Sequence, residues 1–121
     1  MSEIKTHKDL IVWQKSVDFV TDIYKFTRSL PDEEKFGIIS QLRRAAVSIP
    51  ANIAEGAARH SRKEYIQFLY VSLGSTSEIE TLLIIVRNLE FSDADQLKLL
   101  QGKCDEIKKM PTSLIKSMNN S

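Results

Sequence analysis

Hydrophobic residues recur every three or four positions along most of the chain, which is the spacing of amphipathic helices. This pattern predicts four helices, over about residues 10–29, 32–60, 62–89 and 93–118. Pro31 separates the first two, and Ser61 with Glu64 forms a capping box at the start of the third. Because short connections favour antiparallel neighbours, the predicted fold is all-α, an antiparallel up-down-up-down four-helix bundle. We expect one domain over residues 1–121.

Two of the helices carry more apolar residues than one core stripe requires. The first has a stripe that includes Trp13, Val17 and Tyr24, with a second apolar stripe beside it. The third has apolar residues outside its core heptad. Since surplus apolar faces require a partner, the pattern predicts self-association. The expected interface residues are Phe19, Ile23, Phe26, Ile66, Tyr70, Leu73 and Ile84.

A row of polar residues follows one face of the second helix. The row consists of Gln41, Arg44, Ser48, Asn52, Glu55 and Arg59. One interpretation is a solvated face, which is how most charged residues lie. The alternative, which we favour, is a structural polar network in which Glu78 or Glu80 of the third helix pairs with Arg44 or Arg59.

Pro50 interrupts the hydrogen bonding of the second helix. It removes one backbone N–H donor and predicts a kink, with Ser48 or Asn52 satisfying the freed carbonyl groups. A ligand site at the kink is the alternative to this structural reading.

Charge adds one candidate site. The chain has 17 basic and 16 acidic residues, so its net charge of +1 produces no overall attraction to nucleic acid. Basic residues gather in "RHSRK", where Arg59, Arg62 and Lys63 form a candidate nucleic-acid-binding patch, with Arg43 as a contributor from the second helix. The alternative is a solubilising loop. No aromatic residue lies inside the patch, so it predicts phosphate contacts rather than base recognition.

Candidate catalytic chemistry is sparse. The two histidines, His7 and His60, show no metal-binding spacing, and Cys104 lies on the apolar heptad of the fourth helix. We therefore expect no catalytic residues, no metal and no cofactor, and a protein that is not an enzyme. A single cysteine and the lack of a signal peptide or a long apolar run predict a cytoplasmic protein without a membrane partner.

Several stretches occur in a recognisable order over roughly residues 9–91, namely "DLIVWQKS", "LPDEEKFGI", "SQLRRAAVSIPANIAEGAAR", "SRKEYIQFL" and "LGSTSEIE". Together they resemble one known family, the 23S ribosomal RNA intervening-sequence proteins. The resemblance implies a bundle that assembles as a homopentamer and a gene that often lies within an insertion in the large ribosomal RNA gene. A distant similarity to the accessory protein of diversity-generating retroelements implies work with nucleic acid.

Two functional hypotheses follow. In the first, the oligomer binds RNA or DNA weakly through the basic patch. In the second, it is a scaffold or adaptor that recruits a partner protein.

Overall fold

The computed structural model describes residues 7–120, in which all regular structure is helical. Its elements are α1 (His7–Thr27), the short 3-10 helix η1 (Asp32–Glu34), α2 (Ile38–Ala57), α3 (Arg62–Asn88) and α4 (Ala94–Asn119). The predicted all-α fold with four long helices is confirmed. The predicted single domain of 1–121 also includes residues 1–6 and 121, which lie outside the described residues.

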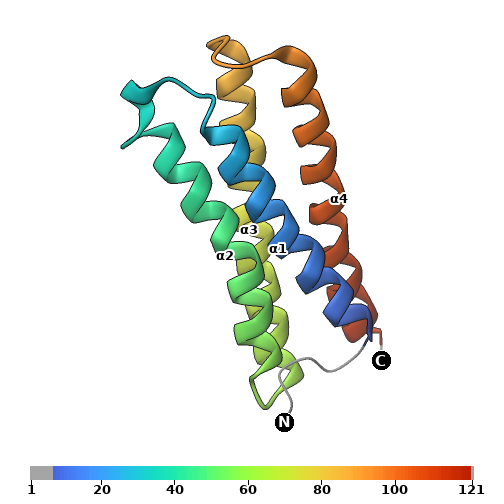
Figure 1. Ribbon diagram of the computed structural model, residues 1–121. Helices are drawn as coiled ribbons and strands as arrows, with labels where there is room; N and C mark the ends of the chain where they lie inside the picture. Colours follow the sequence, from blue (N-terminus) through green and yellow to red (C-terminus); the bar gives the residue numbers. More distant parts are fainter. Residues whose placement is uncertain (1–6, 121) are drawn as a thin grey trace.

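The four helices pack as a bundle (Figure 1). α1 contacts α2 and α4, and α3 also contacts α2 and α4, so α1 and α3 lie diagonally across the described part of the bundle. The α1–α2 and α3–α4 connections lie at one end, and the α2–α3 connection lies at the other.

The predicted start of the second helix at residue 32 is wrong. Pro31 is extended (φ −58°, ψ 137°), and the acidic residues after it form η1 instead. Gly37 then leaves helical geometry (φ −110°, ψ −110°), so α2 begins only at Ile38. The third helix begins as predicted, because the Ser61 hydroxyl accepts a hydrogen bond from the Glu64 backbone N–H at 3.1 Å.

The two apolar stripes of α1 have the opposite roles to those predicted. Phe19, Ile23 and Phe26 are 2%, 0% and 2% exposed and fill the core of the bundle, so they are not available as interface residues. In the other stripe, Val17 and Tyr24 are exposed, and Trp13 and Val20 are half-buried. α1 therefore does carry a surplus apolar stripe, but on the side that includes Val17 and Tyr24.

α2 and α3 approach each other closely at Gly56. A Cβ atom at this position would lie 2.7 Å from Phe68 Cβ and 2.9 Å from Tyr65 Cδ1. The lack of a side chain at Gly56 is thus a packing requirement of the α2–α3 contact. Nearer its middle, α2 continues through the buried Pro50, and α4 likewise continues through Pro111.

Candidate functional site

The predicted basic patch lies at the α2–α3 connection. The Arg59 guanidinium pairs with Glu55, with an Nη2–Oε2 distance of 2.9 Å, and its Cζ lies 4.9 Å from the centre of the Phe68 ring. Arg62 reaches α4, where its Nη1 lies 3.4 Å from the Met118 carbonyl oxygen. Lys63 is exposed. Part of the positive charge of this patch is therefore neutralised within the chain itself.

Arg43 is not part of that patch. Its Nε donates a hydrogen bond to Thr27 Oγ1 at 2.8 Å, and its guanidinium lies 4.6 Å from the centre of the Tyr24 ring. Arg43 lies fourteen residues before the end of α2 at Ala57, a helical rise of about 21 Å, whereas Arg59 follows that end. The structure thus places Arg43 on the α1–α2 contact, and the four predicted nucleic-acid-binding residues do not form one surface.

The middle of the polar row contains a hydrogen-bonded cluster. Asn52 Nδ2 donates to the Ser48 hydroxyl at 2.9 Å and to the Ser48 carbonyl at 2.8 Å. Ser75 of α3 donates its hydroxyl to Ser48 Oγ at 2.8 Å, and Ser72 donates to the Ile49 carbonyl at 3.2 Å. The hydroxyls of Ser72 and Ser75 therefore join α3 to α2 near Pro50.

The predicted acidic partners of the row lie elsewhere. Glu80 pairs with Lys108 of α4 at 3.0 Å, a contact that raises the pKa of Lys108. Arg59 pairs within its own helix, with Glu55. The expected pairing of Glu80 with Arg44 or Arg59 is therefore wrong, because Glu80 faces α4 rather than α2. The remaining members, Gln41, Arg44, Glu55 and Glu78, are exposed.

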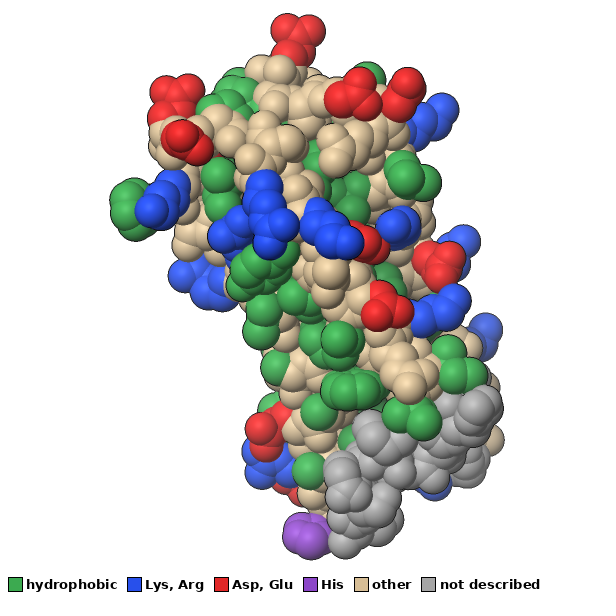
Figure 2. Space-filling view, viewed as in Figure 1, with side chains coloured by type: hydrophobic (Ala, Val, Ile, Leu, Met, Phe, Trp, Pro, Cys, Tyr) green, Lys and Arg blue, Asp and Glu red, His purple; other side chains and the backbone are tan. Residues whose placement is uncertain are grey.

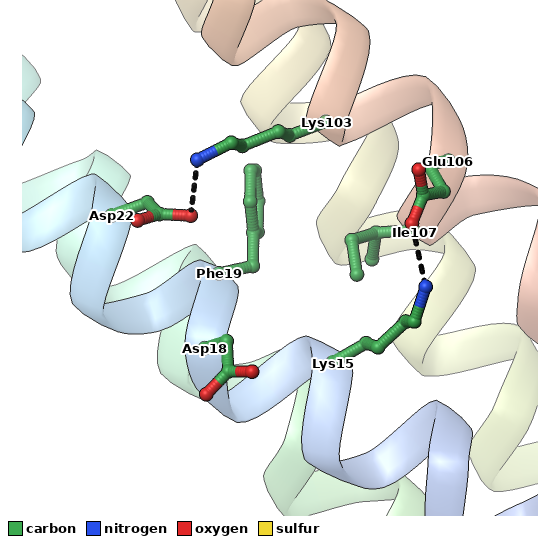
Figure 3. A pocket seen from close by; sticks show the side chains of 7 residues that line it. All are labelled: Lys15, Asp18, Phe19, Asp22, Lys103, Glu106 and Ile107. Carbon is green, nitrogen blue, oxygen red and sulfur yellow. Dashed lines mark hydrogen bonds and ion pairs between the residues drawn. The ribbon is translucent and has the colours of Figure 1, made fainter.

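A groove between α1 and α4 contains further charged groups (Figure 3). It is lined by Lys15, Asp18, Phe19, Asp22, Lys103, Glu106 and Ile107. Two ion pairs cross it, Lys15–Glu106 at 3.1 Å and Lys103–Asp22 at 3.0 Å. Since these charges already satisfy each other across the groove, the arrangement serves to hold α1 against α4. Exposed pairs of this kind contribute about 0.2–1 kcal/mol each.

Two buried titratable groups belong to the core rather than to a reactive site. Cys104 is 1% exposed, and burial with nearby Glu80 raises the pKa of its thiol to about 12. Tyr65 is also buried, and burial with the adjacent Asp9 raises the pKa of its phenol above the usual range. Both groups are therefore neutral at pH 7. Within the described residues, no group of three or more His, Cys, Asp or Glu side chains is arranged to hold a metal ion.

One exposed apolar surface lies on α1 and α2, which we call the α1/α2 face. Val17 of α1 is 37% exposed, Tyr24 is 36% exposed and Val47 of α2 is 44% exposed. Trp13 and Val20 lie half-buried beside them. Figure 2 shows hydrophobic side chains across the middle of this side of the molecule, below a group of Lys and Arg.

A second exposed apolar surface lies on α3, which we call the α3 face. It comprises Tyr70 (55% exposed), Ile84 (42%) and Ile85 (38%), with Ile66 and Leu73 half-buried. Ser77, Thr81 and Asn88 continue the same helical row, so the row from Ile66 to Asn88 bears no charge. Four of the predicted interface residues, Ile66, Tyr70, Leu73 and Ile84, thus lie on one surface.

The apolar character of α3 has a second consequence. By length and composition alone, Arg62–Asn88 is the one helix among the described residues that would allow a membrane crossing, with a mean hydropathy of 1.4. This is weak support for a membrane span, because the core helix of a water-soluble bundle passes the same test. α3 packs against both α2 and α4 as such a core helix does.

Comparison with known proteins identifies close structural similarity. A family described as 23S rRNA-intervening sequence protein matches residues 8–113. A crystal structure from Bacteroides thetaiotaomicron, described as a protein with unknown function from the S23 ribosomal protein family, is similar with a TM-score of 0.80. The two chains are 33% identical, over 90% of this chain and 98% of the other. No curated protein matches the chain.

Proposed function

Because this chain belongs to the family of 23S rRNA-intervening sequence proteins, we propose that it is a non-enzymatic, self-associating helical-bundle scaffold. Its proposed role is to present several identical copies of its surface to a partner. The resemblance noted from the sequence favours a homopentamer, and its proposed location is the cytoplasm. The expected up-down-up-down order fits the positions of the connections at the two ends of the bundle.

The uncharged row on α3 is the observation that carries this proposal. Between Ile66 and Asn88 this row covers about six turns of α3 without one charged residue, although most of its residues are on the exposed side of the helix. A helix of a lone bundle needs one apolar stripe, and α3 already buries Leu69, Ile79 and Leu83 completely. A second apolar surface on the same helix is typical of a protein–protein contact.

Light scattering coupled to size-exclusion chromatography tests the association. A pentamer of the 13.8 kDa chain has a mass of about 69 kDa. Another defined multiple of the chain mass would retain the scaffold and reject the number five. A mass of 13.8 kDa at micromolar concentration would contradict self-association itself.

Weak RNA binding by the α2–α3 connection is the second candidate. It is favoured by three basic side chains within five residues at one end of the bundle, of which Lys63 and Arg62 are exposed. It is opposed by the Arg59–Glu55 pair and by the separate position of Arg43. An oligomer would repeat this small patch, and several weak phosphate contacts would then act together.

Filter binding to 23S ribosomal RNA fragments at about 50 mM and about 200 mM salt tests this candidate. The variant Arg62→Glu/Lys63→Glu removes the exposed charges and leaves Arg59 with Glu55. Lys98→Glu/Lys109→Glu makes the same change of charge on exposed α4 positions and serves as the matched control. Binding that is lost in the first variant and retained in the second supports the candidate. Absence of binding by the unaltered protein at the lower salt rejects it.

A further inference from the structure

We propose that a pocket between the first half of α1 and the latter part of α4 binds a single-chain anionic amphiphile of the size of a medium-chain fatty acid. The pocket has a volume of about 380 Å³ and is lined by Ile11, Val12, Glu106, Lys109, Met110 and Ser113. It lies outside the α1/α2 face, the α3 face and the α2–α3 connection. The inference is therefore independent of the proposed self-association and of RNA binding.

The wall of this pocket is apolar over most of its area. Val12 is 5% exposed and belongs to the core, and Met110 is half-buried against the same core. Ile11 lies beside them and is 37% exposed. An alkyl chain in the pocket removes both its own surface and that of Ile11 from water, which is favourable. The volume lies at the lower end of the range of ligand pockets, about 300–1,000 Å³, and so suits a small ligand.

The α4 side of the pocket is able to adjust to a bound chain. Met110 has an unbranched, flexible thioether side chain that fits irregular shapes. The next residue, Pro111, has no backbone N–H and gives no hydrogen bond to the Ile107 carbonyl. The turn of α4 that carries Met110 is thus held by one hydrogen bond fewer than an uninterrupted helix. A ligand therefore widens the pocket at a lower cost there than in the neighbouring turns.

Positive charge surrounds the pocket. Lys15 of α1 pairs with Glu106 at 3.1 Å, so the charge of Glu106 is balanced (Figure 3). Lys109 lies on the rim, and Lys116 follows two turns later on the same side of α4. Both lysines are exposed, and neither forms an ion pair within residues 7–120. An apolar pocket with an unbalanced positive rim favours a ligand with an anionic head and an apolar tail.

A pocket between α3 and α4 offers a comparison within the same chain. Leu83 and Ile84 give it a partly apolar wall, but Glu80 and Asp105 also line it. Lys108 pairs with Glu80 at 3.0 Å, which leaves the negative charge of Asp105 unbalanced. An anionic amphiphile should therefore enter the pocket at Met110 rather than this one.

Methionine-methyl NMR detects a ligand in the pocket at Met110 directly. The chain has three methionines, of which Met110 lines the pocket. In protein with isotopically labelled methionine methyl groups, decanoate should shift the Met110 resonance in a saturable manner, with a submillimolar dissociation constant. The variant Met110→Leu assigns that resonance. Acetate has the head group without the tail and should leave the resonance unchanged.

Two further ligands test the tail and the head separately. Octanoate should bind about fivefold more weakly than decanoate, because each fully buried methylene strengthens binding about fourfold and the pocket is open to solvent. Decylamine has a tail of the same length and a positive head, and it should also bind about fivefold more weakly than decanoate. In Lys109→Glu/Lys116→Glu the order of decanoate and decylamine should reverse. Lys35→Glu/Lys98→Glu makes the same change of charge at the other end of the bundle and should preserve the order.

Ile11→Gln tests the apolar wall itself, and circular dichroism verifies that each variant keeps its helices. Because Ile11 is partly exposed, the polar side chain should leave the fold intact and weaken decanoate binding about fivefold or more, at an unchanged oligomeric mass.

Four results would overturn the proposal. The first is a Met110 resonance that does not shift with decanoate or that shifts equally with acetate. The second is decanoate binding that is as tight in Ile11→Gln as in the unaltered protein. The third is an order of the two head groups that does not respond to Lys109→Glu/Lys116→Glu. The fourth is a changed oligomeric mass in Ile11→Gln, which would show that a second copy of the chain fills the pocket.

Discussion

Replacement of Gly56 by alanine tests the closest contact between α2 and α3. The new methyl group would lie 2.7 Å from Phe68 Cβ, 2.9 Å from Tyr65 Cδ1 and 3.2 Å from the Tyr65 carbonyl oxygen. Phe68 Cβ and the Tyr65 carbonyl are attached rigidly to α3, so neither moves away without a shift of the helix. The substitution therefore forces α2 and α3 apart at this point.

The expected cost is the difference between two opposing effects. Overpacking of a core contact costs about 1–3 kcal/mol, and the rigid neighbours place Gly56→Ala at the upper end of that range. Alanine is favoured over glycine in a helix interior by about 1 kcal/mol, and the gain is smaller here because Gly56 lies in the last turn of α2. We expect the free energy of unfolding to fall by about 2 kcal/mol. For a chain of this size the melting temperature should fall by about 6–12 °C.

Thermal unfolding followed by circular dichroism, at one fixed protein concentration, measures this change. Gly102→Ala is the matched control, since Gly102 is exposed in the middle of α4 and a Cβ there meets no atom within 4 Å. That variant should gain about 0.5–1 kcal/mol from helix propensity alone. A Gly56→Ala variant that melts at or above the temperature of the unaltered protein would refute the close α2–α3 approach.

Three further predictions concern the polar and titratable groups. Asn52→Ala should lower the free energy of unfolding by about 1–2 kcal/mol in urea titrations, because it removes two hydrogen bonds to Ser48. An unchanged urea midpoint would mean that these two hydrogen bonds do not stabilise the fold. Glu55→Ala should change the free energy of unfolding by at most about 0.5 kcal/mol, because the side chains of Glu55 and Arg59 are 54% and 42% exposed. A loss above about 2 kcal/mol would indicate that the pair belongs to a buried polar network. Burial raises the pKa of the Cys104 thiol from 9.0 to about 12, so the folded state disfavours the thiolate and the free energy of unfolding should fall as pH rises above about 9. In denaturant titrations at pH 8 and pH 10.5, Cys104→Ser should lose less stability between the two pH values than the unaltered protein. An equal loss in both proteins would contradict the raised pKa of Cys104.

The polar row of α2 shows where reading the sequence alone reaches its limit. Ser48, Asn52 and Glu55 follow one another at helical spacing, so their common face was predictable. Their partners were not, because Ser75 lies on another helix and its hydroxyl meets Ser48 only at one relative rotation of α2 and α3. Glu80 illustrates the same point, since the rotation of α3 about its own axis decides whether its carboxylate meets a partner on α2 or Lys108 on α4.

The sequence by itself determined the four helices, because capping groups and apolar spacing act within a few residues of each other. Ser61 with Glu64 sets the start of α3 in this local way. Only the tertiary structure decided which stripe of α1 is core, since Phe19 and Val17 belong to neighbouring stripes that both consist of apolar residues. That choice depends on how α1 is rotated about its own axis, and the rotation is fixed by simultaneous packing against α2 and α4.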